Sequence, residues 1–151
     1  MKPFKRIVAI VLVALCFVSA IAISAFADTE NNTRSVYLSN GTGAYGQVRG
    51  KDNDTSIYLY INSAPTSHSY VAAYGCSSSG SGCVNLTCVD GSTVDYVICR
   101  TGVGYSVHSL VNEAGYSYTR LGFTALTTAS GYLSYTWSPD SSSSHVDAYN
   151  L

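Results

Sequence analysis

Residues 56–62 read Ser-Ile-Tyr-Leu-Tyr-Ile-Asn, and this short stretch decides the fold class. Ile57, Leu59 and Ile61 alternate along it with Tyr58 and Tyr60. Successive side chains of a β-strand point to opposite faces, so the three aliphatic residues share one face and the two tyrosines share the other. The alternation predicts a half-buried strand with an aliphatic core face and an aromatic outer face.

The chain after Asp28 repeats this pattern many times. Tyr, Val and Thr, which favour strands, alternate with small or polar residues, and Gly, Asn, Asp and Ser interrupt the runs at short intervals. The predicted strands cover residues 35–39, 47–51, 56–62, 69–76, 84–89, 93–100, 105–111, 116–126 and 130–137. Many short, evenly spaced strands predict an all-β fold, a single antiparallel β-sandwich. Strand parity predicts a core made of Ile57, Leu59, Ile61, Val71, Leu121, Phe123, Leu133 and Trp137.

The first 27 residues have the three parts of a secretory signal peptide. Lys2, Lys5 and Arg6 precede an apolar run over residues 7–23, and Ala-Phe-Ala at 25–27 supplies a cleavage site. We therefore expect export and an extracellular product. The alternative is a retained membrane anchor, because the apolar run is nearly long enough to span a bilayer.

This organisation predicts a signal peptide at 1–27, a sandwich domain at 28–137 and a loosely ordered C-terminal tail at 138–151. No second long apolar run follows the leader, so we expect no membrane contact after cleavage. Three of the eight basic residues lie in the leader, whereas all nine acidic residues follow it. The remaining arginines are scattered, which argues against a nucleic acid partner, since that needs a basic patch.

Four cysteines follow the leader, an even number that predicts two disulfides in an exported chain. Asp90-Gly91 predicts a two-residue hairpin turn, and counting outward from it brings Cys83 beside Cys99. This count favours Cys83 with Cys99, and therefore Cys76 with Cys88. The alternative is Cys76 with Cys83 and Cys88 with Cys99, which requires an irregular loop. The spacing is a poor match to a zinc site.

Residues 40–46, Asn-Gly-Thr-Gly-Ala-Tyr-Gly, contain the glycine spacing of a dinucleotide-binding loop. Such a loop must open a helix, whose N-terminus binds the pyrophosphate, but turn and strand residues follow here. The glycines are instead typical of a hairpin or bulge that requires positive φ. We expect no cofactor.

Candidate catalytic residues are isolated along the chain. His68, His108 and His145 belong to no metal-binding or nucleophile motif, although His108 with Asp95 and one of the many serines would supply the three side chains of a hydrolytic triad. Glu113 is the one acidic residue in an apolar and aromatic stretch, and it is the best candidate for a functional carboxylate. We therefore predict a protein that is not an enzyme and holds no metal.

Tyrosine is the unusual feature of the composition, because all thirteen tyrosines follow the leader while charged residues are few. A tyrosine ring offers a flat apolar face with a polar tip, which suits recognition surfaces. An outward row would form a contiguous binding patch of Tyr58, Tyr60, Tyr70, Tyr74 and Tyr118. The simpler interpretation is that tyrosine favours half-exposed strands.

The leader, the strand domain rich in Tyr, Ser and Gly, and the ending "GYLSYTWSPDSSS" at residues 131–143 resemble small, largely uncharacterised secreted proteins of Gram-positive bacteria. The resemblance implies no catalytic residue or ligand. The favoured hypothesis is a secreted, non-catalytic module that binds a cell-wall glycan or a surface protein through its tyrosines, with self-association at edge strands as a further possibility. The alternatives are a bacteriocin or toxin-like protein and, less favoured, a secreted hydrolase.

Overall fold

A computed structural model describes residues 29–141 and 145–149 of the chain. The predicted signal peptide lies outside these residues. The strands are β1 (Asn32–Leu38), β2 (Ala44–Tyr45), β3 (Arg49–Gly50), β4 (Ile57–Ser63), β5 (His68–Cys76), β6 (Val84–Asn85), β7 (Cys88–Val89), β8 (Ser92–Thr93), β9 (Val97–Arg100), β10 (Gly104–Val107), β11 (Tyr118–Ala125), β12 (Gly131–Ser138) and β13 (Val146–Asp147). The described residues include no helix that could cross a membrane.

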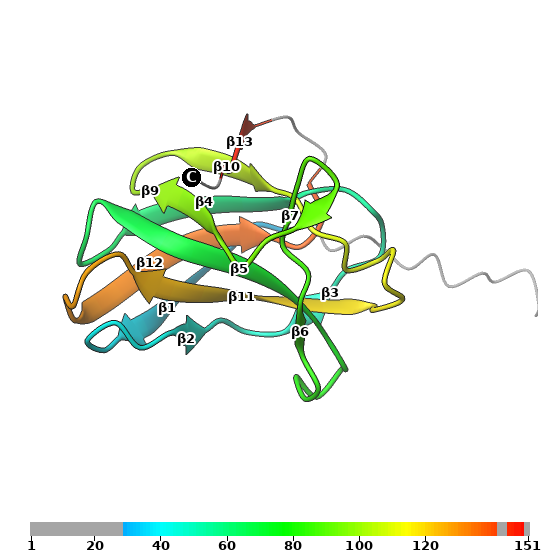
Figure 1. Cartoon of the computed structure of the whole chain (residues 1–151), viewed down its shortest axis with the longest axis horizontal. Coiled ribbons are helices and arrows are strands. Elements are labelled where there is room, and N and C mark those ends of the chain that lie inside the picture. Colours follow the sequence, from blue (N-terminus) through cyan, green and yellow to red (C-terminus); the bar gives the residue numbers. More distant parts are fainter. Residues whose placement is uncertain (1–28, 142–144, 150–151) are drawn as a thin grey trace, which may run out of the picture.

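Two sheets pack face to face to form the predicted all-β sandwich (Figure 1). The first sheet has the order β1-β12-β4-β10-β13. The second has the order β2-β11-β5-β6, with β3 also pairing with β11 and β9 with β5. Pairing is antiparallel except between β10 and β13, which run parallel. The short hairpin β7–β8 stands apart from both sheets.

The core lies between the inner faces of the two sheets, as strand parity predicts. All eight predicted core residues are at most 1% exposed. Ile57, Leu59 and Ile61 line the inner face of β4, whereas Tyr58 and Tyr60 on its outer face are half-buried. The prediction from residues 56–62 is therefore confirmed, because burial of the aliphatic side chains decides which face of the strand points toward the core.

The glycines of residues 40–46 serve backbone geometry, as expected. Asn40 and Gly41 both have positive φ, at 43° and 74°, and close the turn in which the Thr42 amide donates to the Ser39 carbonyl at 2.7 Å. Gly46 has a different role, because a Cβ atom there would overlap the hydroxyl of the buried Tyr135. A side chain is thus excluded at Gly46 by close packing between the sheets.

The favoured disulfide pairing is wrong. Cys76 bonds to Cys83, while Cys88 and Cys99 are free, buried thiols, so one half of the alternative pairing is correct. The hairpin turn itself is confirmed, with Cys88 opposite Thr93. Its ladder stops there, however, because β9 pairs with β5 and puts Cys99 opposite Ser69. The count outward from the hairpin therefore predicts the wrong cysteine partner, because the chain after β8 pairs with β5 and does not continue the hairpin.

The described residues of the predicted C-terminal tail contact both sheets. Asp140 is buried and its carboxylate lies 3.1 Å from the ammonium of Lys51, which is buried too. Further along, β13 adds to the edge of β10, and the Ile98 amide donates to the Tyr149 carbonyl at 2.7 Å. These contacts attach the tail to both sheets, and no local sequence pattern encodes them.

Candidate functional site

Two small residues create a hollow on the outer face of the second sheet. Ala72 on β5 and Gly122 on β11 are direct cross-strand partners, and both lie on the outer side of their strands. Outward residues two positions away along β5 are Tyr70 and Tyr74. Both small residues line the cavity, and Gly122 lets two rings approach closely, because a Cβ atom there would lie 2.8 Å from the Tyr74 ring and 3.3 Å from the Tyr45 ring.

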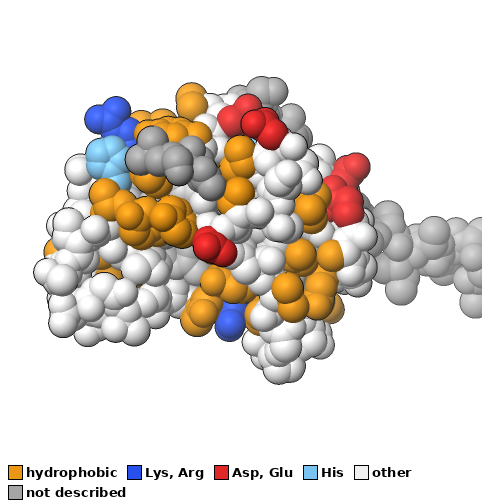
Figure 2. Space-filling view, in the orientation of Figure 1, with side chains coloured by type: hydrophobic (Ala, Val, Ile, Leu, Met, Phe, Trp, Pro, Cys, Tyr) orange, Lys and Arg blue, Asp and Glu red, His pale blue; other side chains and the backbone are white. Residues whose placement is uncertain are grey.

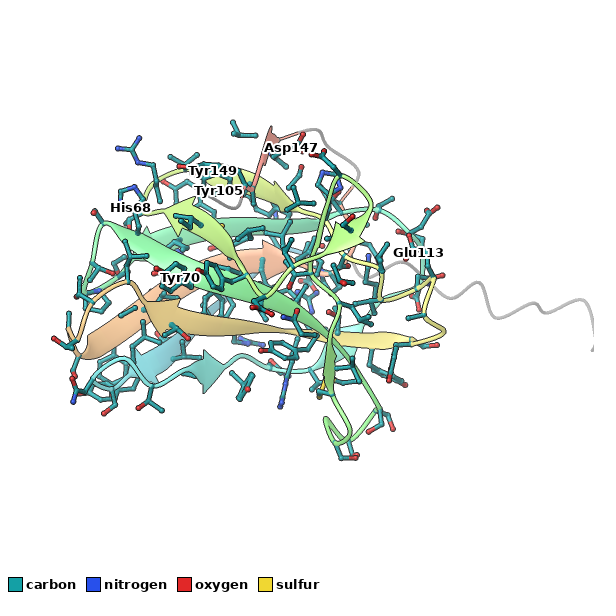
Figure 3. All side chains as sticks on the ribbon, viewed as in Figure 1. His68, Tyr70, Tyr105, Glu113, Asp147 and Tyr149 are labelled. Atoms are coloured by element: carbon teal, nitrogen blue, oxygen red, sulfur yellow. A yellow bond between two sulfur atoms is a disulfide. The ribbon has the colours of Figure 1, made fainter. Side chains whose placement is uncertain are left out.

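Four tyrosines wall the hollow. Tyr70 and Tyr74 stand at its two ends along β5, Tyr45 on β2 lies beyond Gly122, and Tyr96 precedes β9. We call this site the tyrosine groove, and its cavity volume is about 270 Å³. Figure 2 shows hydrophobic side chains gathered over β5 and β11 with acidic and basic side chains beside them, and Figure 3 places Tyr70 on this face.

The rings of the tyrosine groove pack in two pairs. The centroids of Tyr70 and Tyr96 are 4.2 Å apart, and those of Tyr45 and Tyr74 are 5.4 Å apart in an edge-to-face arrangement. Aromatic pairs at these distances attract each other beyond simple burial. Burial, followed by the neighbouring Tyr45, raises the pKa of Tyr74 above its ordinary value. The paired packing therefore holds the rings in place before any ligand arrives.

One charged group lines the tyrosine groove, and a second contacts a tyrosine of its wall. Asp95 contributes to its lining beside Tyr96. Arg120 is the cross-strand partner of Tyr74, and its guanidinium lies 4.1 Å from the centroid of the Tyr45 ring. Stacked rings with a hydrogen-bond acceptor and a donor at the rim can bind a ligand that has both apolar faces and polar edges.

The predicted tyrosine patch is divided between the two sheets, so it is not contiguous. Tyr58 and Tyr60 lie on β4 in the first sheet, whereas Tyr70 and Tyr74 lie on β5 in the second. These pairs face opposite sides of the sandwich because each set points away from the shared core. Tyr118 shares the outer face of Tyr70 and Tyr74 but is at the start of β11, away from the groove lining.

Tyr45 and Tyr96 line the groove but are not among the five tyrosines of the predicted patch. Tyr45 belongs to a two-residue strand that is defined only by its pairing with β11, where it lies opposite Gly122. Tyr96 precedes β9. The available signal was the small outward pair, since Gly122 interrupts the outward positions of the predicted strand at 116–126. A glycine inside a strand often marks a close approach of another group.

His108 is part of a hydrogen-bonded trio, with a different acid from the one considered in the sequence. Its Nδ1 lies 3.0 Å from the Ser56 hydroxyl and its Nε2 lies 2.9 Å from the carboxylate of Asp147, not of Asp95. The His108 and Asp147 side chains are 49% and 75% exposed. Water therefore competes for both bonds, which differs from the buried acid that orients a catalytic histidine. The trio fastens β13 to β10.

The remaining candidates do not converge on a reaction centre. Glu113 is exposed in the turn at residues 111–115 (Figure 3). His68 hydrogen-bonds its neighbour Ser67, and His145 packs on the Tyr58 ring at 4.4 Å. Among residues 29–141 and 145–149, no group of three His, Cys, Asp or Glu side chains is placed to hold a metal ion. The tyrosine groove is therefore the best supported candidate site.

Comparison with known proteins gives a family but no activity. No curated protein matches the chain. A family model described as a protein of unknown function, DUF2712, matches residues 19–141, which include nearly all of the sandwich. The chain therefore belongs to the DUF2712 family.

Proposed function

We propose that this protein is an exported, non-catalytic binding module that recognises a saccharide in the tyrosine groove. The observation that carries the proposal is the ring of four tyrosines around the Ala72–Gly122 floor. A sugar ring has apolar C–H faces and a rim of hydroxyls. Tyrosine matches both, since its ring packs on the apolar face and its hydroxyl bonds the rim.

The packing of the groove favours binding. Tyrosine has few rotatable bonds, and the pairs Tyr70–Tyr96 and Tyr45–Tyr74 already restrain one another. A ligand therefore meets a preorganised surface and less side-chain entropy is lost on binding. The groove lies on the outer face of the sheet, where one unit of a longer saccharide chain could bind.

The predicted export of the protein favours a ligand that lies outside the cell. The leader at residues 1–27 has the composition of a signal peptide, and the Cys76–Cys83 disulfide suits an oxidising compartment. The resemblance to secreted proteins of Gram-positive bacteria directs the proposal to a cell-wall glycan as the ligand. Asp95 would accept hydrogen bonds from sugar hydroxyls at the groove rim.

The test compares the two outer faces of the sandwich. Tyr70→Ala and Tyr96→Ala each remove a wall of the tyrosine groove, and Tyr58→Ser with Tyr60→Ser changes the same residue type on the opposite sheet. Binding of the purified mature protein to isolated cell-wall polysaccharide is measured by co-sedimentation and calorimetry. Thermal melting checks that each variant is folded.

We expect each groove variant to bind about fivefold more weakly or worse, because stacking on one aromatic ring contributes about 1 kcal/mol or more. The opposite-face double variant should bind like the wild type. Normal binding by both groove variants, or loss of binding only in the opposite-face variant, would contradict the proposal.

A further inference from the structure

Arg120 is a half-buried cation whose side-chain N–H groups have no hydrogen-bond partner among the described residues. Its Nε atom is buried and has no hydrogen-bond partner. Among the described residues, no carboxylate forms an ion pair with it, and its recorded contact is the face of the Tyr45 ring. A buried, unsatisfied donor costs stability unless something else binds it.

Three other cations of the described residues already donate to acceptors within the protein. Arg34 donates to Gln47, Arg49 donates to the carbonyl oxygen of Trp137, and Lys51 pairs with Asp140. Arg120 thus differs from them, since ring stacking holds its position without occupying its N–H groups. The two terminal nitrogens of the guanidinium are not buried like Nε, and together they offer a planar pair of donors, the geometry that matches an acid group.

The Arg120 guanidinium lies next to the tyrosine groove. Arg120 precedes Gly122 on the outer side of β11, so it stands one outward position from the groove floor. Its stacking partner Tyr45 and its cross-strand partner Tyr74 both line the groove. Asp95 lies in the lining next to Tyr96, which belongs to the other pair of rings.

We infer that the saccharide bound in the tyrosine groove carries an acidic group, a carboxylate or a phosphate, that pairs with Arg120. This inference rests on the proposed function and specifies its ligand class. Asp95 repels a second anion and accepts hydroxyl hydrogens, so it orients the ligand with its acid toward Arg120. A sugar unit with one acid group can pair that group with Arg120 and donate hydroxyl hydrogens to Asp95. A neutral sugar leaves the guanidinium without an anion.

The experiment measures binding of the mature protein to three sets of probes. These are neutral oligosaccharides, uronic-acid oligosaccharides of matched linkage, and sugar phosphates, presented as an array and followed by calorimetry. Arg120→Gln removes the guanidinium, and Arg120→Lys keeps the charge without it. Arg100→Gln is the matched control, because Arg100 is an exposed arginine of the same sheet that lies opposite His68.

We expect acidic probes to bind at least tenfold more tightly than neutral ones, with a preference that weakens at high salt. Arg120→Gln should abolish the preference, Arg120→Lys should retain part of it, and Arg100→Gln should leave it unchanged. The carboxylate and phosphate probes distinguish the two sources of acid, and either one supports the inference.

Equal binding of neutral and acidic probes, lost in Tyr70→Ala, would overturn the acidic ligand and leave the saccharide groove standing. Acid preference that survives Arg120→Gln would also overturn the role of Arg120. Absence of binding to every probe would overturn both the groove and its ligand class. Melting curves of the variants separate loss of binding from loss of folding, because Arg120→Gln also removes the contact with Tyr45.

Discussion

The ion pair between Lys51 and Asp140 provides a sharp test of how the C-terminal segment is attached. Both side chains are 0% exposed, and the ammonium also donates to the carbonyl oxygens of Thr55 and Pro139. The second carboxylate oxygen of Asp140 accepts the Asp52 amide at 3.1 Å. Asp140→Asn keeps the shape of the side chain and removes its charge, which leaves a buried ammonium without a counter-ion.

Breaking one partner of a buried ion pair costs about 3–5 kcal/mol. For a domain of this size, each kcal/mol lost from the free energy of unfolding lowers the melting temperature by about 4 °C. The melting temperature should therefore fall by roughly 12–20 °C. Burial also lowers the pKa of Lys51, and the charge and hydrogen bond of Asp140 oppose that shift by favouring the charged ammonium. The double variant Lys51→Met with Asp140→Asn should lose less than the sum of the single changes.

Chemical denaturation and calorimetry measure these losses, and Asp147→Asn is the matched control. Asp147 pairs with His108 in the same C-terminal segment but its side chain is 75% exposed, so its loss should cost at most about 1 kcal/mol. If Asp140→Asn costs no more than Asp147→Asn, the segment after β12 is not packed as described. Strict additivity of the Lys51 and Asp140 changes would equally refute the pairing.

Two further predictions concern the thiols and the buried tyrosine. Cys88 and Cys99 are free and buried, and burial raises the pKa of Cys99 to about 12. In the protein without residues 1–27, which carry Cys16, a thiol reagent should therefore label two cysteines, and only after denaturation. Labelling of none or of four would contradict the single disulfide. Burial raises the pKa of Tyr135, so this residue stabilises the fold below about pH 10 and loses that contribution as pH rises through its folded pKa. Tyr135→Phe should therefore retain more of its free energy of unfolding at alkaline pH than the wild type in denaturant titrations, and parallel losses would contradict this.

The fold class and the core could be read from the sequence because they depend on strand parity. In residues 56–62 every second side chain is aliphatic, and only one register buries all three. The same reasoning located Leu121, Phe123, Leu133 and Trp137, all fully or almost fully buried. The turn at Asp90-Gly91 was equally local, since both residues adopt the positive φ that their sequence favours.

Pairing between distant segments was decided only by the tertiary structure. Parity showed that Tyr58 and Tyr70 point outward, but assignment of β4 and β5 to different sheets placed them on opposite sides of the molecule. The tyrosine groove likewise depends on Gly122 meeting both Ala72 and Tyr45 across strand ladders. Cys99 remained free for the same reason, because β9 joined β5 and moved it from the hairpin. Alternation along a strand specifies a face, whereas the partner of that strand depends on the packing of the whole chain.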